Sequence, residues 1–140
     1  MATLADLIED LVTANRILAT QGIVDSFGHV SIRHPDNPKR YLLSRSRAPE
    51  RVETGDIMEF TLEGDPVDAK GRKPYLERFI HGAAYEMRPD VMACIHNHSP
   101  GVIPFGITRC RATRRSTCRS SRRESRTARS AASTRRRTRR

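Results

Sequence analysis

The chain has 140 residues and a formal net charge of +10, from 26 Lys and Arg against 16 Asp and Glu. This length suits one modest domain, and an odd number of cysteines (Cys94, Cys110 and Cys118) without paired spacing excludes a disulfide framework. No apolar run approaches the ~18 residues of a membrane span, and the first residues lack the pattern of a signal peptide. We therefore expect a cytoplasmic protein with no membrane contact.

The charge is unevenly distributed along the chain. Residues 109–140 hold 14 of the 26 basic residues and a single acid, Glu124, whereas residues 1–108 are slightly acidic. After Thr108 almost every residue is Arg, Ser, Thr, Ala or Cys, a composition that cannot bury enough surface to offset its ordering entropy. We predict a globular domain over 1–108 and a low-complexity tail over 109–140, which is either disordered or the product of a frameshift at or just after Thr108.

The first half of the domain alternates between helical and strand patterns. Apolar residues at three- and four-residue spacing predict an amphipathic helix over Leu4–Thr20. Phe27–Arg33 alternates and predicts a strand, and Tyr41–Ser44 predicts its returning hairpin partner. Ile57–Leu62 predicts a further strand between two turns.

The second half predicts one more helix and one more strand. Tyr75–Met87 has a helical pattern with Leu76 and Ile80 on its apolar side, and Arg88-Pro-Asp90 ends it. Val91–Ile95 is a continuous apolar run, which is typical of a strand buried on both faces. This order of elements predicts a sheet flanked by helices.

Two histidines, His96 and His98, follow the last predicted strand. Strand side chains two residues apart point to the same face, so both imidazoles can reach one divalent metal such as zinc. The alternative is a pair of polar histidines in a loop. Two ligands do not complete a metal site, so at least one more group is required.

Glu77 and His81 lie four residues apart on the predicted second helix and would share one of its faces. An exposed Glu–His pair is the simpler interpretation. However, only a short turn separates this helix from the strand that ends in His96, so the carboxylate of Glu77 is expected near the metal pair. Metal-assisted proton abstraction requires this combination. Earlier in the chain, Gly28 near Ser26 permits close approach by a ligand, with a simple turn as the alternative.

Four motifs, in order, resemble the class II aldolase/adducin family. They are Gly28-His-Val-Ser-Ile-Arg33, Glu77-Arg-Phe-Ile-His81, Arg88-Pro-Asp-Val91 and His96-Asn-His-Ser-Pro100. The resemblance implies an α/β/α fold with a central, mostly antiparallel sheet, here incomplete at its C-terminus, and usually a homotetramer. It implies a divalent metal, zinc, manganese or another ion, with His96 and His98 as its first two ligands and Glu77 as the catalytic carboxylate.

The sequence departs from this family at three places. The family commonly has Gly-Asn where Gly28-His29 stands. Its phosphate-binding Thr-Gly and Ser-Ser are replaced by Ser46-Arg47 and Tyr75-Leu76. Its third metal histidine lies on a later strand, and no histidine follows His98.

The arginines at the second of these places favour a substrate carboxylate, because a guanidinium grips a planar carboxylate through two bonds. An exposed basic loop is the alternative. The residues expected to bind substrate are Ser26, Gly28, Arg45, Ser46 and Arg47.

We therefore expect a metal-dependent lyase that cleaves a C–C bond of a hydroxylated carbonyl or carboxylate substrate, a hydroxy acid or a sugar phosphate. Loss of the C-terminal part of the domain would impair this chain. Two alternatives belong to other classes. One is a non-catalytic, adducin-like interaction domain, which would generally lack the metal histidines. The other is nucleic-acid binding through the basic tail, which is disfavoured because no aromatic residue is interleaved to stack on bases.

Overall fold

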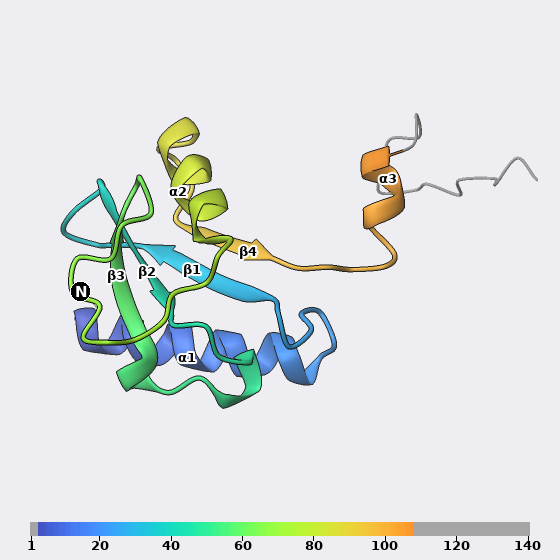
Figure 1. Cartoon of the computed structure of the whole chain (residues 1–140), viewed down its shortest axis with the longest axis horizontal. Helices are drawn as coiled ribbons and strands as arrows, with labels where there is room; N and C mark the ends of the chain where they lie inside the picture. Colours follow the sequence, from blue (N-terminus) through green and yellow to red (C-terminus); the bar gives the residue numbers. More distant parts are fainter. Residues whose placement is uncertain (1–2, 108–140) are drawn as a thin grey trace, which may run out of the picture.

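A computed structural model describes residues 3–107 and forms a four-stranded sheet with helices on both faces (Figure 1). The elements are α1 (Leu4–Thr20), β1 (His29–Arg33), β2 (Arg40–Ser44), the 3-10 turns η1 (Pro49–Arg51) and η2 (Thr54–Asp56), β3 (Ile57–Thr61), α2 (Arg78–Met87), β4 (Ala93–His96) and α3 (Ile103–Ile107). The strand order is β3-β2-β1-β4, and every neighbouring pair is antiparallel. The predicted tail and the predicted frameshift after Thr108 lie outside the described residues.

Helix α1 begins and ends where its apolar spacing predicts. Thr3 caps it, since the Thr3 hydroxyl accepts from the amide of Asp6 while the Asp6 carboxylate accepts from the amide of Thr3. The helix lies along one face of the sheet (Figure 1). The core on that face is formed by Leu11, Val12, Val30, Leu42, Val52 and Ile57.

The opposite face of the sheet carries α2 and a more aromatic core. Its buried residues are Tyr41, Leu43, Met58, Phe60, Tyr75 and Tyr85. Successive strand side chains alternate between the two cores, because strand side chains point alternately to opposite faces. The predicted α/β/α arrangement with an antiparallel sheet is therefore confirmed.

Helix α2 begins at Arg78, three residues later than predicted. The chain before it is held extended: Pro74 bridges to Arg45, the Ser46 amide donates to the Lys73 carbonyl, and Tyr75 is buried in the core. The predicted apolar side of the helix is also wrong, since Leu76 is 81% exposed and Ile80 is exposed too. The helix buries His81, Gly82 and Tyr85 instead.

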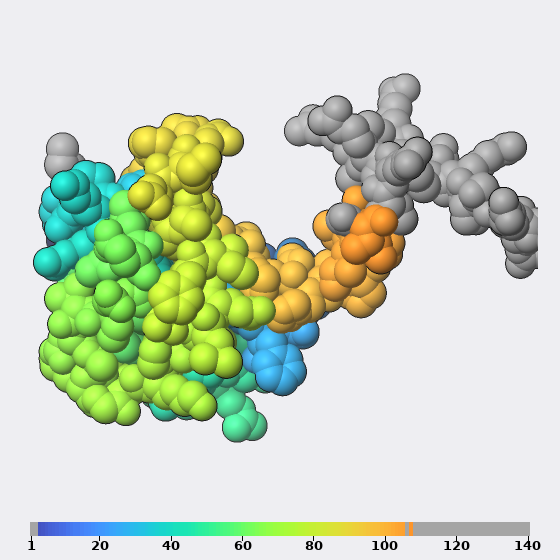
Figure 2. Space-filling view, turned by 45° about the horizontal axis from the view of Figure 1, so that its top comes forward, coloured from blue at the N-terminus to red at the C-terminus, as the bar shows by residue number. Residues whose placement is uncertain are grey.

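Strand β4 is an edge strand, and the prediction that it is buried on both faces is wrong. It pairs only with β1 among the strands that the structure describes, and α1 does not reach across it. The side chain of Ile95 is consequently 49% exposed beside an apolar groove that α1 shares. After β4 the chain leaves the body of the domain as an arm that carries α3 (Figure 2). No helix within residues 3–107 is long and apolar enough to cross a membrane.

Candidate metal and substrate site

Glu77, His96 and His98 converge at the end of β4, as the sequence predicts. Nε2 of His96 lies 3.2 Å from Nε2 of His98. The carboxylate of Glu77 reaches both rings, with Oε2 3.4 Å from Nε2 of His96 and Oε1 3.7 Å from Nε2 of His98. Glu77 is the residue before the first turn of α2, His96 is the last residue of β4, and His98 follows two residues after it. Two imidazoles and a carboxylate are a donor set that suits zinc and similar divalent ions.

Asp25 lies next to His98, on the side of its Nδ1 atom. Its Oδ1 accepts from the amides of Phe27 and Gly28 at 3.0 and 2.8 Å, and its Oδ2 lies 3.4 Å from Nδ1 of His98. Partial desolvation raises the pKa of Asp25, but the two amides and His98 outweigh it and lower that pKa below its ordinary value. A carboxylate at Nδ1 places the proton there and leaves Nε2 of His98 free to bind a metal.

A third histidine, His29, lies beside this group. It is the cross-strand partner of His96 in the β1–β4 pair, and the two rings stack with centroids 4.9 Å apart. The ring of His29 is fully buried, and its Nε2 has no hydrogen-bond partner among residues 3–107, although it lies 3.6 Å from Oε2 of Glu77. Burial, and then the neighbouring His96, lower the pKa of His29 to about 4, so its ring is neutral near pH 7. The ligand atoms of His29, Glu77 and His96 all lie within 4.8 Å of one another.

A hydrogen-bonded chain runs inward from the other nitrogen of His29. Nδ1 of His29 lies 2.7 Å from Nε2 of His81, Nδ1 of His81 lies 2.6 Å from Oγ of Ser31, and that oxygen lies 2.7 Å from the hydroxyl of Tyr85. His81 is fully buried, and burial followed by its two histidine neighbours lowers its pKa to about 3. His81 does not pair with Glu77 on a helix face, because Glu77 precedes α2 and the His81 ring points into the core.

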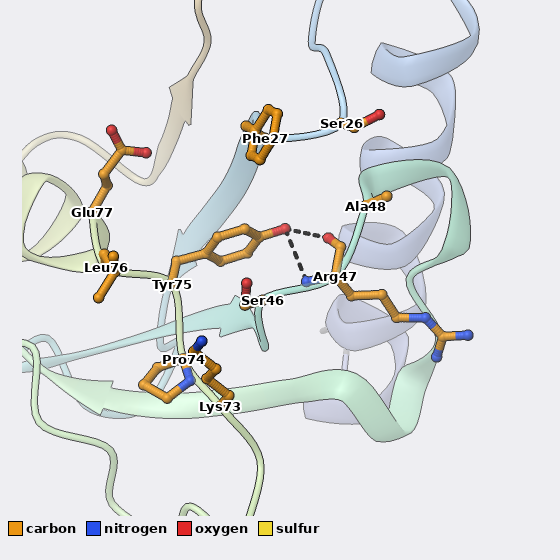
Figure 3. Close-up of a pocket in the computed structure, with 10 residues that line it drawn as sticks. All are labelled: Ser26, Phe27, Ser46, Arg47, Ala48, Lys73, Pro74, Tyr75, Leu76 and Glu77. Carbon is orange, nitrogen blue, oxygen red and sulfur yellow. Dashed lines mark hydrogen bonds between the residues drawn. The ribbon is translucent and has the colours of Figure 1, made fainter.

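A cavity of about 400 Å³, which Glu77 helps to line, opens beside this group of side chains; Figure 3 shows its lining residues. Its walls come from the segment before β1, the loop after β2 and the segment before α2. The lining residues are Ser26, Phe27, Ser46, Arg47, Ala48, Lys73, Pro74, Tyr75, Leu76 and Glu77. Three of the five predicted substrate-binding residues, Ser26, Ser46 and Arg47, thus line the same cavity as the predicted catalytic carboxylate.

The guanidinium groups of the two loop arginines do not point into that cavity, contrary to expectation. Both guanidinium groups bind Asp56: Nε of Arg45 lies 2.5 Å from Oδ1, and Nη1 of Arg47 lies 2.7 Å from Oδ2. Arg45 does not line the cavity, and the guanidinium of Arg47 points away from it (Figure 3). Burial alone would raise the pKa of Asp56, but bonds from Arg45, the Glu53 amide and Arg47 lower it below its ordinary value.

Gly28 also differs from its expected role. A Cβ at this position would lie 2.6 Å from Cβ of Val24 and 3.2 Å from the carbonyl oxygen of His96. The close approach that glycine permits is therefore to the protein's own atoms, where β1 begins beside β4. Gly28 does not line the cavity.

Several site residues were missed by sequence reasoning. His29 departs from the family's Gly-Asn, but the sequence alone indicates no role for it; the signal that reveals one is the antiparallel pairing of β1 with β4, which places it opposite His96. Asp25 carries no motif that distinguishes it from a turn residue. Lys73 and Tyr75 reach the cavity only because the chain before α2 is extended.

The comparisons with known proteins agree on one protein family. Residues 9–132 match the model of the Class II Aldolase and Adducin N-terminal domain. The decarboxylase tropJ of Talaromyces stipitatus is 31% identical over 103 residues, which is 72% of this chain and 39% of that protein. The 3,4-dihydroxyphthalate decarboxylase of Arthrobacter keyseri is 32% identical over 105 residues, 68% of this chain and 41% of that protein. The L-fuculose phosphate aldolase of Escherichia coli is 30% identical over 93 residues, 66% of this chain and 40% of that protein.

Solved structures agree with these relatives. The L-fuculose 1-phosphate aldolase from Glaciozyma antarctica superposes with a TM-score of 0.65 at 30% identity, covering 75% of this chain and 46% of that one. An aldolase II superfamily protein from Pseudomonas syringae shares the fold with a TM-score of 0.64 at 23% identity, covering 71% of this chain and 41% of that one. The chain spans about two fifths of the length of its curated relatives. Its fold and its sequence together place the chain in the class II aldolase and adducin N-terminal domain family.

Proposed function

We propose that this chain carries the metal-binding and proton-transfer part of a lyase site that cleaves a C–C bond of a hydroxylated substrate. The observation that supports it is the convergence of Glu77 with His96 and His98, with all three side chains within 3.2–3.7 Å of a neighbour. A non-catalytic interaction domain has no need of two imidazoles and a carboxylate arranged in this way. Relatives of the chain include both aldolases and decarboxylases.

The proposed roles follow from the positions of the side chains. His96 and His98 hold a divalent ion, for which we propose zinc, and Asp25 fixes the orientation of His98. When bound, the ion would stabilise negative charge that develops on a substrate oxygen. Glu77 lies between the histidines and the cavity, so its carboxylate can accept a proton from a hydroxyl group of a substrate in that cavity.

For the substrate we propose a hydroxylated carboxylate with an aromatic or other planar apolar part, in preference to a sugar phosphate. The cavity offers Phe27, Tyr75 and Leu76 as apolar walls, and the side chains of Phe27 and Leu76 are largely exposed. Lys73 provides its cation, since the Arg47 guanidinium is held by Asp56 and no ion pair of Lys73 occurs within residues 3–107. Two relatives are named decarboxylases.

The test combines metal content with a substrate screen. The chain is purified, loaded with Zn²⁺, dialysed and compared with a His96→Ala/His98→Ala variant for bound zinc, with a His34→Asn variant as the matched control. Hydroxybenzoates, other hydroxy acids and sugar phosphates are then screened for released CO₂ or aldehyde. Equal zinc content in parent and double variant would reject the metal assignment, and turnover restricted to sugar phosphates would reject the substrate.

A further inference from the structure

His29 occupies a position from which its imidazole can reach the metal-binding group. It lies directly opposite His96 in the β1–β4 register, so both side chains leave the same face of the sheet. Their rings stack with 22° between the planes, and the Nε2 atom of His29 is 3.6 Å from the carboxylate of Glu77.

The two nitrogens of His29 have contrasting surroundings. Nδ1 is hydrogen-bonded to His81, whereas Nε2 is buried and has no hydrogen-bond partner in the described part of the chain. A buried polar atom without a partner carries an uncompensated desolvation penalty. The position of this nitrogen beside a carboxylate and another imidazole is explained if a cation normally lies between them.

We propose that His29 joins His96 and His98 as a third imidazole ligand of the divalent ion, bound through Nε2. The ligand atoms of His29, Glu77 and His96 already lie within 4.8 Å of one another, and three protein ligands are typical of a catalytic zinc site. This inference rests on the proposed function, in which His96 and His98 hold the ion.

The buried series of hydrogen bonds behind His29, through His81, Ser31 and Tyr85, suits a metal-binding histidine. If Nε2 keeps its lone pair for the ion, Nδ1 carries the proton and donates to Nε2 of His81. His81 then donates from Nδ1 to the Ser31 hydroxyl, which donates to the oxygen of Tyr85, so each ring nitrogen has one defined role. A partner at the second nitrogen of a metal-bound histidine fixes its tautomer and ring orientation.

The competing interpretation is a core histidine whose Nε2 carries a proton directed at Glu77. The same chain can run in that opposite direction, from Tyr85 through Ser31 and His81 to His29. The two interpretations differ in the number of imidazole nitrogens bound to the ion, because a core histidine contributes none.

The experiment uses the full chain and two metal probes. Cu²⁺ is added to the metal-free protein, and pulsed EPR counts the coupled imidazoles; we expect three in the parent and two in His29→Asn. Zn²⁺ affinity is measured by competition with a chelator, where His29→Asn should weaken binding roughly tenfold or more. His34→Asn is the control, since His34 faces Glu59 rather than this site, and it should change neither result.

The outcomes separate the two hypotheses. If the parent binds neither ion, or His96→Ala binds as tightly as the parent, the proposed function fails. If His96→Ala loses the ion while the parent shows only two coupled imidazoles and His29→Asn keeps its Zn²⁺ affinity, the role of His29 is overturned and the proposed function stands. The count on the parent does not depend on any variant folding, and His29→Gln replaces His29→Asn if circular dichroism shows that the latter is unfolded.

Discussion

Oε2 of Glu77 lies 3.6 Å from Nε2 of His29 and 3.4 Å from Nε2 of His96, so one carboxylate oxygen faces two imidazoles that come from different strands. Glu77 is partly exposed and also lines the cavity, whereas His29 is buried. The carboxylate is therefore in reach both of these two histidines and of the space available to a substrate. Its role can be tested separately from that of the histidines.

We predict that Glu77→Gln keeps the metal and lowers kcat, because the amide preserves the shape of the side chain and cannot accept the proton. The expected loss is roughly 10²–10⁴-fold, the usual contribution of a general acid or base. Turnover is measured on the substrate found by the screen, with bound zinc determined on the same sample. Glu86→Gln, an exposed change on the following helix α2, should alter neither. A kcat within about threefold of the parent would remove Glu77 from the mechanism, and loss of zinc would make it a ligand.

Asp25→Asn is predicted to weaken metal binding through His98. The asparagine keeps the turn but lowers the preference for a proton on Nδ1 of His98, so Nε2 is less often available to the ion. We expect Zn²⁺ affinity to fall by roughly tenfold, as for other partners of metal-bound histidines. Chelator competition measures it, with Asp36→Asn in an exposed turn as the matched control. Unchanged affinity in Asp25→Asn would show that the 3.4 Å contact does not orient His98.

Much of the fold follows from local patterns. The apolar spacing and the Thr3 cap specify α1 to the residue, and alternation places β1, β2 and β3 within two residues of their observed ends. The errors occur where distant contacts decide the conformation. Tyr75 begins the helical pattern of the sequence, yet burial of its ring and the bridge from Pro74 to Arg45 keep this segment extended.

The candidate site was predictable in part. His96 is the last residue of β4 and His98 lies two residues further on, so sequence spacing alone places them together. The ion pairs of Asp56 with Arg45 and Arg47 could not be found in this way, because Asp56 sits in η2 and its carboxylate meets the loop only in three dimensions. The same holds for His29, whose position opposite His96 depends on the register of two strands that are far apart in sequence.

The buried histidines predict a pH dependence of stability in the metal-free protein. The pKa values of His29 and His81 fall from 6.5 to about 4 and about 3 on folding. As pH drops below 6.5 the unfolded chain takes up these protons and the folded protein does not. Stability is therefore highest above pH 6.5 and is lost towards pH 4, by about 1.4 kcal/mol per pH unit for each histidine.

Urea denaturation in the presence of EDTA, at several values between about pH 7.5 and about pH 4.5, measures this dependence. His81→Gln should flatten the slope, because it removes one of the two titrating groups. His34→Asn, outside the buried chain, should keep the slope of the parent. An equal slope in parent and His81→Gln would show that the buried histidines do not govern acid stability.

Arg45 and Arg47, the two loop arginines, are predicted from the sequence to bind a substrate carboxylate, but the structure indicates a role in stability. Both side chains bind the buried carboxylate of Asp56, and the amide of Glu53 donates to the same oxygen as Arg47 at 2.9 Å. A lysine cannot reproduce the planar set of donors that an arginine offers. Arg45→Lys and Arg47→Lys should each lower the free energy of unfolding only modestly, since both pairs are partly exposed to water.

Neither substitution should alter KM, because Arg45 lies outside the cavity and the guanidinium of Arg47 points away from it (Figure 3). Lys73→Met serves as the comparison, since Lys73 lines the cavity and its loss should raise KM for a carboxylate substrate by roughly tenfold, with stability unchanged. Urea denaturation and steady-state kinetics on the same samples separate the two effects. A higher KM with unchanged stability in Arg47→Lys would show that Arg47 does bind the substrate. Its bond to Asp56 would then have to open when the substrate binds.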